Sequence, residues 1–327
     1  MNNQELSILS VPDFSISEFE QGDSSTKNLM KKALRECCKE HGFFTVSDHG
    51  ISKSLIQNTL QVTRKFFSLP IEIKRLCVSD NILESQMKER GYVEKEFNYN
   101  NPISKDAPLD LNEGFLVGRN LTQEQIDNLS NIIKKECYSN NIWPEGFPEM
   151  KSIMDAYYEE MFLLSIKVRD LLQYALDFEV PHCEYATSLI RMNYYPRIIK
   201  KASPGQMRIS EHADFCMFTI LLTEDINSKQ EKIEKVTAGG LEVFAKEKGW
   251  CGLSYDRLSF VVNCGDTLDS LSNKKCKSSL HRVRVPKPDP ERDNSRVSLA
   301  YFCSADYAFD KNSIESYQKI VNDGNKR

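Results

Sequence analysis

The sequence lacks the features that mark several large classes of protein. No apolar run approaches the about 20 residues that a membrane-spanning helix needs, and no block of lysine and arginine breaks the mixed charge pattern. The net charge of −4 gives no excess of positive charge that would attract nucleic acid or an anionic membrane. The first residues also lack the basic and apolar regions of a secretory signal. These absences predict a cytoplasmic protein that binds neither nucleic acid nor membrane, and they suggest no obligate protein partner.

Cysteine spacing offers no metal or redox motif. The ten cysteines are scattered, and none forms a C-x-x-C pair of the kind found in zinc ribbons and redox proteins. Without a signal peptide, free thiols are expected. Cys37 and Cys38 fall on a predicted helix, and Cys216, Cys264 and Cys303 fall in apolar runs, so we expect them to act as small hydrophobic side chains.

Hydrophobic periodicity changes in character along the chain. Apolar residues at steps of three and four predict helices over 26–41, 53–67 and 148–178, whereas aromatic and β-branched residues predict a strand over 43–47. Residues 80–120 lose this periodicity and are expected to form an irregular covering region. After Pro181, short apolar runs alternate with turn residues, as in a sandwich or barrel, and the polar stretch 224–238 is expected to be a loop. The predicted fold is mainly β with α additions.

Two histidines in the β-rich half lie in a setting that suits a metal ion. His212 and Asp214 are two residues apart, so on a strand both side chains would leave the same face. His281 opens a later strand that could return beside the first. Two histidines and one carboxylate form the facial triad of non-haem Fe(II) oxygenases, which leaves three metal positions open. The H-x-D tripeptide by itself is a weak signal, because it recurs by chance and needs confirming context.

That context comes from a second pair of polar residues on one strand face. Arg296 and Ser298 are also two apart, and a guanidinium beside a hydroxyl suits bidentate binding of a carboxylate. A strand interior is a costly place for arginine without an anionic partner. Tyr195 could donate another hydrogen bond to that carboxylate, although a core aromatic residue is the simpler interpretation of Tyr195 alone.

Together these residues resemble one enzyme family along nearly the whole chain. The isopenicillin-N-synthase-like branch of the Fe(II)/2-oxoglutarate-dependent dioxygenases is marked by short motifs, and this sequence carries them in the same order. They are Val11-Pro12-Asp13-Phe14, Gly42-Phe43-Phe44, His49-Gly50-Ile51, Phe66-Phe67-Ser68-Leu69-Pro70, Arg90-Gly91-Tyr92, Asn193-Tyr194-Tyr195-Pro196, His212-Ala213-Asp214, Gly239-Gly240-Leu241, Val262-Asn263-Cys264-Gly265-Asp266, Ser279-Leu280-His281 and Arg296-Val297-Ser298.

The resemblance implies a double-stranded β-helix, or jelly roll, with N-terminal and packing helices. It implies an N-terminal region over 1–120 packed on a core over 121–327, which holds the long helix and the jelly roll, as one compact unit. The implied cofactor is Fe(II) with 2-oxoglutarate and O₂ as co-substrates. The implied iron ligands are His212, Asp214 and His281, and the implied 2-oxoglutarate residues are Arg296, Ser298, Tyr195 and Asn193.

The implied reaction is oxidation of an unactivated C–H bond, with succinate and CO₂ released. Hydroxylation, desaturation or oxidative cyclisation could follow. We expect a small, carboxylated or amino-acid-derived substrate, held at its carboxylate by Arg90 or Arg191, with Phe302 lining the site. A solvated loop charge is the alternative interpretation of Arg90.

Three other functions are compatible with parts of this pattern. An iron oxidase of the same fold would use electrons from its substrate and no 2-oxoglutarate, and such relatives also carry the Arg-x-Ser pair. A non-catalytic small-molecule receptor would have no use for a triad with open metal positions. A zinc hydrolase is disfavoured because H-x-E-x-x-H spacing is absent.

Overall fold

The computed structural model describes residues 7–78, 90–94, 108–129, 138–183, 187–224, 235–256 and 259–305. Its helices are α1 (Ile16–Gln21), α2 (Ser24–Glu40), α3 (Lys53–Phe67), α4 (Ile71–Arg75), α5 (Gln123–Asn128), α7 (Pro148–Leu176) and α8 (Asp266–Leu271). Its strands are β1 (Ile8–Ser10), β2 (Asp13–Ser15), β3 (Phe43–Ser47), β4 (Gly91–Val93), β5 (Glu113–Gly118), β6 (Leu189–Tyr195), β7 (Ile209–His212), β8 (Phe218–Thr223), β9 (Lys235–Ala245), β10 (Gly249–Asp256), β11 (Phe260–Cys264), β12 (His281–Val283) and β13 (Arg296–Cys303).

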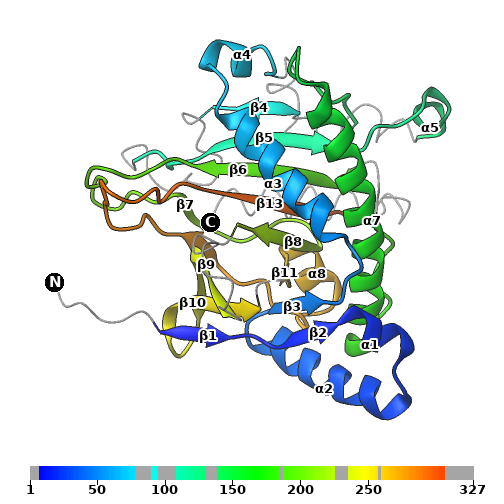
Figure 1. Cartoon of the computed structure of the whole chain (residues 1–327). Coiled ribbons are helices and arrows are strands. Elements are labelled where there is room, and N and C mark those ends of the chain that lie inside the picture. The colour runs from blue at the N-terminus through cyan, green and yellow to red at the C-terminus, as the bar shows by residue number, and fades with distance from the viewer. Residues whose placement is uncertain are drawn as a thin grey trace.

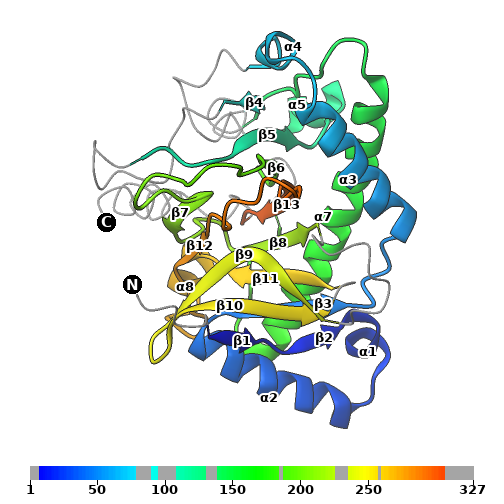
Figure 2. The ribbon, with the colours of Figure 1, turned by 60° about the vertical axis from the view of Figure 1, so that its left-hand side comes forward.

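The strands form two sheets, which Figures 1 and 2 show from two sides. The larger sheet has the order β2-β3-β11-β8-β13-β6-β5-β4, and the smaller has the order β1-β10-β9-β12-β7. From β6 to β13 the chain passes back and forth between them, with β6, β8, β11 and β13 in the larger sheet and β7, β9, β10 and β12 in the smaller. This alternation defines a double-stranded β-helix. The predicted fold class, mainly β with a jelly-roll core and added helices, is confirmed.

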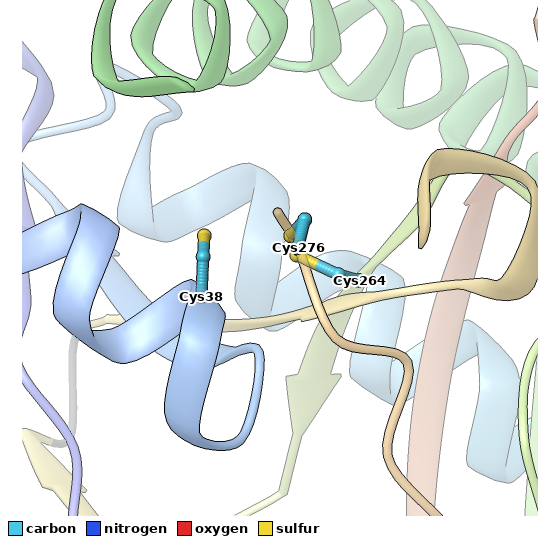
Figure 3. A group of neighbouring side chains, drawn as sticks. All are labelled: Cys38, Cys264 and Cys276. Atoms are coloured by element: carbon cyan, nitrogen blue, oxygen red, sulfur yellow. The ribbon is translucent and has the colours of Figure 1, made fainter. Parts of the chain in front are cut away.

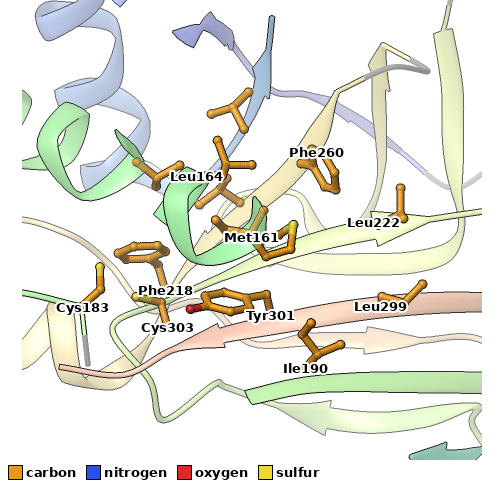
Figure 4. Close-up of a cluster of buried hydrophobic side chains, with 14 of the residues drawn as sticks. Met161, Leu164, Cys183, Ile190, Phe218, Leu222, Phe260, Leu299, Tyr301 and Cys303 are labelled. Atoms are coloured by element: carbon orange, nitrogen blue, oxygen red, sulfur yellow. The ribbon is translucent and has the colours of Figure 1, made fainter. Parts of the chain in front are cut away.

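One face of the larger sheet packs on the long helix α7, which runs across its strands (Figure 1). On β13 the alternate residues Leu299, Tyr301 and Cys303 join the main core with Met161 and Leu164 of α7 (Figure 4). Each of these side chains is at most 1% exposed, and burying one apolar side chain stabilises a fold by about 1.5–3 kcal/mol. The other residues of β13, which begin with Arg296 and Ser298, therefore face the opposite side, toward the smaller sheet.

The three helices predicted from periodicity all form. α2 begins after Asp23, whose side chain accepts a hydrogen bond from the backbone of Thr26, and α3 begins after Ser52 in the same way. α7 has proline at its first position and ends at Asp177, which adopts a left-handed conformation with φ of 45°. The predicted strand over 43–47 is β3. In the part of the chain that is described, no helix is both long and apolar enough to cross a membrane.

One sequence-based expectation about loops was wrong, and a second was wrong at its end. Residues 80–120 are not simply an irregular cover, because they contain β4 and β5, and β5 pairs with β6 in the larger sheet. The short β5 begins and ends close to glycines (Gly114 and Gly118), which hid its strand character. Most of the predicted 224–238 loop lies outside the described residues, but its end, from Lys235, belongs to β9.

Strands from both sides of the predicted 120/121 boundary share the larger sheet. β3 pairs with β11, and β5 pairs with β6. The N-terminal region therefore contributes strands to the sheet that carries Arg296 and Ser298, besides covering it with helices.

Three buried thiols lie close together between α2 and the larger sheet. Cys38 near the end of α2, Cys264 at the end of β11 and Cys276 before β12 gather in one place (Figure 3), with their sulfur atoms within 4.8 Å of one another. The Cys276 thiol donates to the Cys264 sulfur at 2.7 Å. The nine described cysteines are free and buried.

Candidate active site

His212, Asp214 and His281 come together between the two sheets. His212 ends β7 and His281 begins β12, and the two residues are direct partners in the antiparallel ladder. Their ring centroids are 4.2 Å apart. The Asp214 Oδ1 atom lies 3.6 Å from His212 Nε2 and 3.7 Å from His281 Nε2. The three ligand atoms lie within 4.8 Å of one another, close enough to bind one metal ion.

The local reason for this convergence differs from the one that the spacing suggested. β7 ends at His212, so Asp214 does not leave the same face of a strand but lies in the bend that connects β7 to β8. The bend is fixed by the Asp266 backbone N–H, which donates to the Asp214 carbonyl at 2.8 Å. Gly265 lies so close to this bend that a Cβ atom there would be 2.8 Å from the same carbonyl oxygen and 2.1 Å from that of Cys216. Only glycine fits at that position.

Hydrogen bonds leave one atom of each candidate ligand available. Nδ1 of His212 lies 2.8 Å from the Ser210 carbonyl, and Nδ1 of His281 lies 3.2 Å from the Ser279 carbonyl. A carbonyl oxygen only accepts hydrogen bonds, so each Nδ1 carries the proton and each Nε2 presents a lone pair. Bonds of this kind orient the ligands of metal sites.

The carboxylate of Asp214 is held in the same manner. Its Oδ2 atom accepts hydrogen bonds from Thr219 Oγ1 at 2.5 Å and from Asn263 Nδ2 at 2.8 Å. Oδ1 therefore points to the two imidazoles. Two imidazole nitrogens and one carboxylate oxygen match the donor set that Fe(II) takes in facial-triad sites, so the residues fit this metal.

The charge state of the group also suits a metal. Burial, followed by the electrostatic effect of the neighbouring His281, lowers the pKa of His212 to about 4. Burial acts to raise the pKa of Asp214, but the two histidines and the hydrogen bonds from Asn263 and Thr219 together hold it below its ordinary value. At neutral pH the site offers a neutral His212 and an ionised Asp214, the forms that bind metal ions.

Arg296, Ser298, Tyr195 and Asn193 form a second group on adjacent strands. Arg296 pairs with Tyr195, and Ser298 pairs with Asn193, across the β13–β6 ladder. The Tyr195 hydroxyl lies 3.2 Å from Ser298 Oγ, and the Arg296 guanidinium lies 5.0 Å from the centre of the Tyr195 ring. Arg296 and Ser298 are both 1% exposed. The structure thus brings together a buried cation and two hydroxyls, a combination suited to a carboxylate.

The three candidate substrate residues lie on or against neighbouring strands of the larger sheet. Arg191 lies on β6, where its Nε donates to Asn193 Oδ1 at 2.9 Å, and Gly114, which pairs with Asn193, leaves room for the guanidinium. Phe302 on β13 pairs with Thr219, which holds Asp214. Paired residues project to the same side of a sheet, so Phe302 faces the metal-binding group.

Arg90 lies at the far end of β5. It is 1% exposed, and a Cβ atom on Gly118 would be 2.5 Å from its Nε. Its positive charge acts on the hydroxyl of Tyr158, a residue of α7. Arg90 is therefore not a solvated loop charge, the alternative considered from the sequence.

Sequence reasoning gave no role to several residues of the site. Thr219 and Asn263 bind Asp214, and the buried Asp110 accepts hydrogen bonds from the backbone N–H and the hydroxyl of Ser210 at 3.0 and 2.6 Å. Arg208 lies beside Tyr195. A polar residue within an apolar strand was the available signal for Thr219 and Asn263. Asp110 carried no such signal, because it lies in the segment without periodicity.

Comparison with known proteins adds a family to this geometry. A family model described as the N-terminal region of a non-haem dioxygenase in morphine synthesis matches residues 11–146. The model of the 2OG-Fe(II) oxygenase superfamily matches residues 186–305. The second match includes all three candidate metal ligands and the Arg296–Ser298 pair.

Individual proteins resemble the chain over most of its length. Gibberellin 20 oxidase 1 of Arabidopsis thaliana is 30% identical over 298 residues, which cover 90% of this chain and 69% of that protein. A 2-oxoglutarate-Fe(II) type oxidoreductase of Aspergillus fumigatus is 30% identical over 290 residues, covering 86% and 78%. The crystal structure of a full-length Neurospora crassa protein in complex with alpha-KG matches with a TM-score of 0.71 at 24% identity, over 94% of this chain and 88% of that one. This last similarity concerns the fold.

Proposed function

Because this chain belongs to the 2-oxoglutarate- and Fe(II)-dependent oxygenases, we propose that it oxidises an unactivated C–H bond of a small, carboxylated or amino-acid-derived metabolite. The enzyme uses Fe(II) as cofactor and 2-oxoglutarate with O₂ as co-substrates. When bound, the iron supplies the oxidising chemistry, and 2-oxoglutarate is converted to succinate and CO₂. The observation that carries the proposal is the convergence of His212 Nε2, His281 Nε2 and Asp214 Oδ1 on one point.

The proposed iron ligands are His212, Asp214 and His281. Their remaining polar atoms are already engaged by Ser210, Ser279, Thr219 and Asn263, so each residue offers one donor. Three protein donors leave three of six metal positions for the 2-oxo acid and O₂.

The proposed site for the distal carboxylate of 2-oxoglutarate consists of Arg296, Ser298 and Tyr195. The guanidinium supplies the charge and up to two parallel hydrogen bonds, and the hydroxyls of Ser298 and Tyr195 donate further hydrogen bonds to the carboxylate. Asn193 is proposed to lie at the edge of this site, because its Oδ1 already accepts a hydrogen bond from Arg191.

For the substrate carboxylate we favour Arg191 over Arg90. The charge of Arg191 adds to burial and to His281 in lowering the pKa of His212, which puts its guanidinium within electrostatic reach of the metal-binding group. Burial raises the pKa of Asp110, and the charge of Arg191 opposes that effect as well. Arg90 instead acts electrostatically on the hydroxyl of Tyr158, a residue of α7. Phe302 is proposed to pack on the apolar part of the substrate.

The cofactor part of the proposal is tested by anaerobic titration of the Fe(II) protein with 2-oxoglutarate. A weak visible charge-transfer band that saturates is the expected result. Failure to bind iron would overturn the proposed function. An iron complex without the band would support the oxidase alternative. The family's use of 2-oxoglutarate as co-substrate argues against that alternative.

The substrate part is tested by succinate release with a panel of small acids and their neutral amides. Acids, not amides, are expected to stimulate turnover, and Arg191→Gln is expected to lower that stimulation. Arg197→Gln is the matched control, since Arg197 is exposed and its guanidinium donates to the Pro290 carbonyl. Equal stimulation by acids and amides in the wild type would refute a carboxylated substrate, and binding without turnover across the panel would favour a receptor.

A further inference from the structure

Arg208 is a second arginine that enters the space between the sheets. It directly precedes β7, and its backbone N–H donates to the Val283 carbonyl at 2.8 Å, which continues the pairing of β7 with β12. Alternate residues of an extended segment project to the same side. Arg208 is therefore on the side of Ser210 and His212, at the end of β7 farther from the metal ligands.

Arg208 lies close to Arg296. The Arg208 guanidinium is 5.5 Å from the centre of the Tyr195 ring, and the Arg296 guanidinium is 5.0 Å from the same centre. Both arginines are 1% exposed. Two cations and the Tyr195 phenol thus share one enclosed region beside Ser298.

The contacts of Arg208 do not neutralise its charge. Its Nη2 atom donates to the carbonyls of Asn294 at 2.6 Å and Pro196 at 3.3 Å, and both acceptors are uncharged. Its Nε has no hydrogen-bond partner. Within the described ranges, no carboxylate lies at ion-pair distance from this arginine. A buried charge without a counter-ion is costly.

The electrostatics agree with this geometry. Burial and then the like charge of Arg296 lower the pKa of Arg208 to about 10, whereas the negative charge of Asp293 opposes them more weakly. Arg208 stays protonated at neutral pH. The region therefore carries two buried positive charges that an anion would stabilise.

We propose that Arg208 binds the distal carboxylate of 2-oxoglutarate together with Arg296, and that it makes the site selective for dicarboxylic 2-oxo acids. This inference rests on the proposed role of Arg296 and adds a second cation to it. Succinate, which retains the distal carboxylate, would be held by the same pair and would compete with 2-oxoglutarate.

The test compares two ligands that differ only at the distal end. Both 2-oxoglutarate and 2-oxobutyrate can chelate iron through the 2-oxo acid, but only the former has a second carboxylate. Their dissociation constants are measured anaerobically on the Fe(II) protein, from the charge-transfer band, for the wild type, Arg208→Met and Arg208→Lys. A lost charged hydrogen bond corresponds to a weakening of about 10- to 100-fold. We expect Arg208→Met to weaken the binding of 2-oxoglutarate and succinate by about that factor and to leave the binding of 2-oxobutyrate unchanged. The affinity of Arg208→Lys for 2-oxoglutarate should lie between those of the wild type and Arg208→Met.

Controls separate this inference from its premise and from a structural role. Arg197→Met removes an exposed arginine from the same region and should change neither constant. Unchanged 2-oxoglutarate affinity in Arg208→Met would overturn the inference. An equal loss for both ligands would overturn it too, because it would mean that Arg208 only anchors the Asn294 and Pro196 segments. If Arg208→Met does not fold, Arg208→Lys is used in its place, and the change in its 2-oxoglutarate dissociation constant is again compared with the change for 2-oxobutyrate. Unchanged 2-oxoglutarate affinity in Arg296→Met would instead refute the proposed role of Arg296, on which this inference rests, and would leave the proposed iron site untouched.

Discussion

Removal of the Thr219 hydroxyl should weaken iron binding without touching a metal ligand. Thr219 is 2% exposed and donates to Asp214 Oδ2 at 2.5 Å, so Thr219→Val deletes one of two buried hydrogen bonds to that carboxylate and keeps the shape of the side chain. A hydrogen bond to a charged group contributes about 1.5–3 kcal/mol. Loss of such a supporting contact lowers metal affinity by about 10- to 100-fold, and the two ranges agree. Asn263 still holds Oδ2, so we expect binding to be weakened and not abolished.

The assay is anaerobic competition for Fe(II) between the protein and a coloured chelator. Thr45→Val is the matched control, because Thr45 is 1% exposed on β3, which is separated from β8 by β11 in the same sheet, and its hydroxyl donates to the Asp13 carboxylate at 2.6 Å. The control loses the same kind of hydrogen bond and should keep wild-type iron affinity. A folded Thr219→Val protein that binds iron as tightly as the wild type would refute the argument that this hydroxyl orients Asp214.

Three further predictions address the metal, the co-substrate and the fold. Asp214→Ala should abolish Fe(II) binding and turnover while circular dichroism stays unchanged, and turnover at the wild-type rate would refute the ligand assignment. Arg296→Ala should weaken the binding of 2-oxoglutarate by about 2–3 kcal/mol, measured from the half-saturating concentration of 2-oxoglutarate. An unchanged concentration would argue against Arg296 as the residue that binds its distal carboxylate. Lys74→Met should destabilise the protein by about 3 kcal/mol in urea titrations, because Lys74 and its partner Glu113 (2.6 Å) are mostly buried. The exposed Lys65, changed in the same way, should have little effect, and equal effects would contradict this reasoning.

Local patterns in the sequence were sufficient for much of the fold. The long helix α7 follows from apolar residues at helical spacing and from proline at its start, and β3 follows from five consecutive strand-forming residues. β5 escaped prediction because its pairing with β6 depends on a segment more than 70 residues away in the chain. Its two glycines, Gly114 and Gly118, are explained by Arg191 and Arg90, whose side chains occupy the space that a Cβ would fill.

For the site, residue type and spacing identified the chemistry, since imidazole, carboxylate and guanidinium groups are rarely placed in strands without a partner. The tertiary structure decided which atoms are available. Asp214 reaches the two histidines through a bend fixed by Gly265 and Asp266, not through strand alternation. Arg208 could not be distinguished by sequence from a surface arginine, because its burial beside Arg296 depends on β7 and β13 meeting across the barrel. Spacing along a chain determines which side of one strand a residue occupies, but packing between strands from distant segments determines which charges must share a buried site.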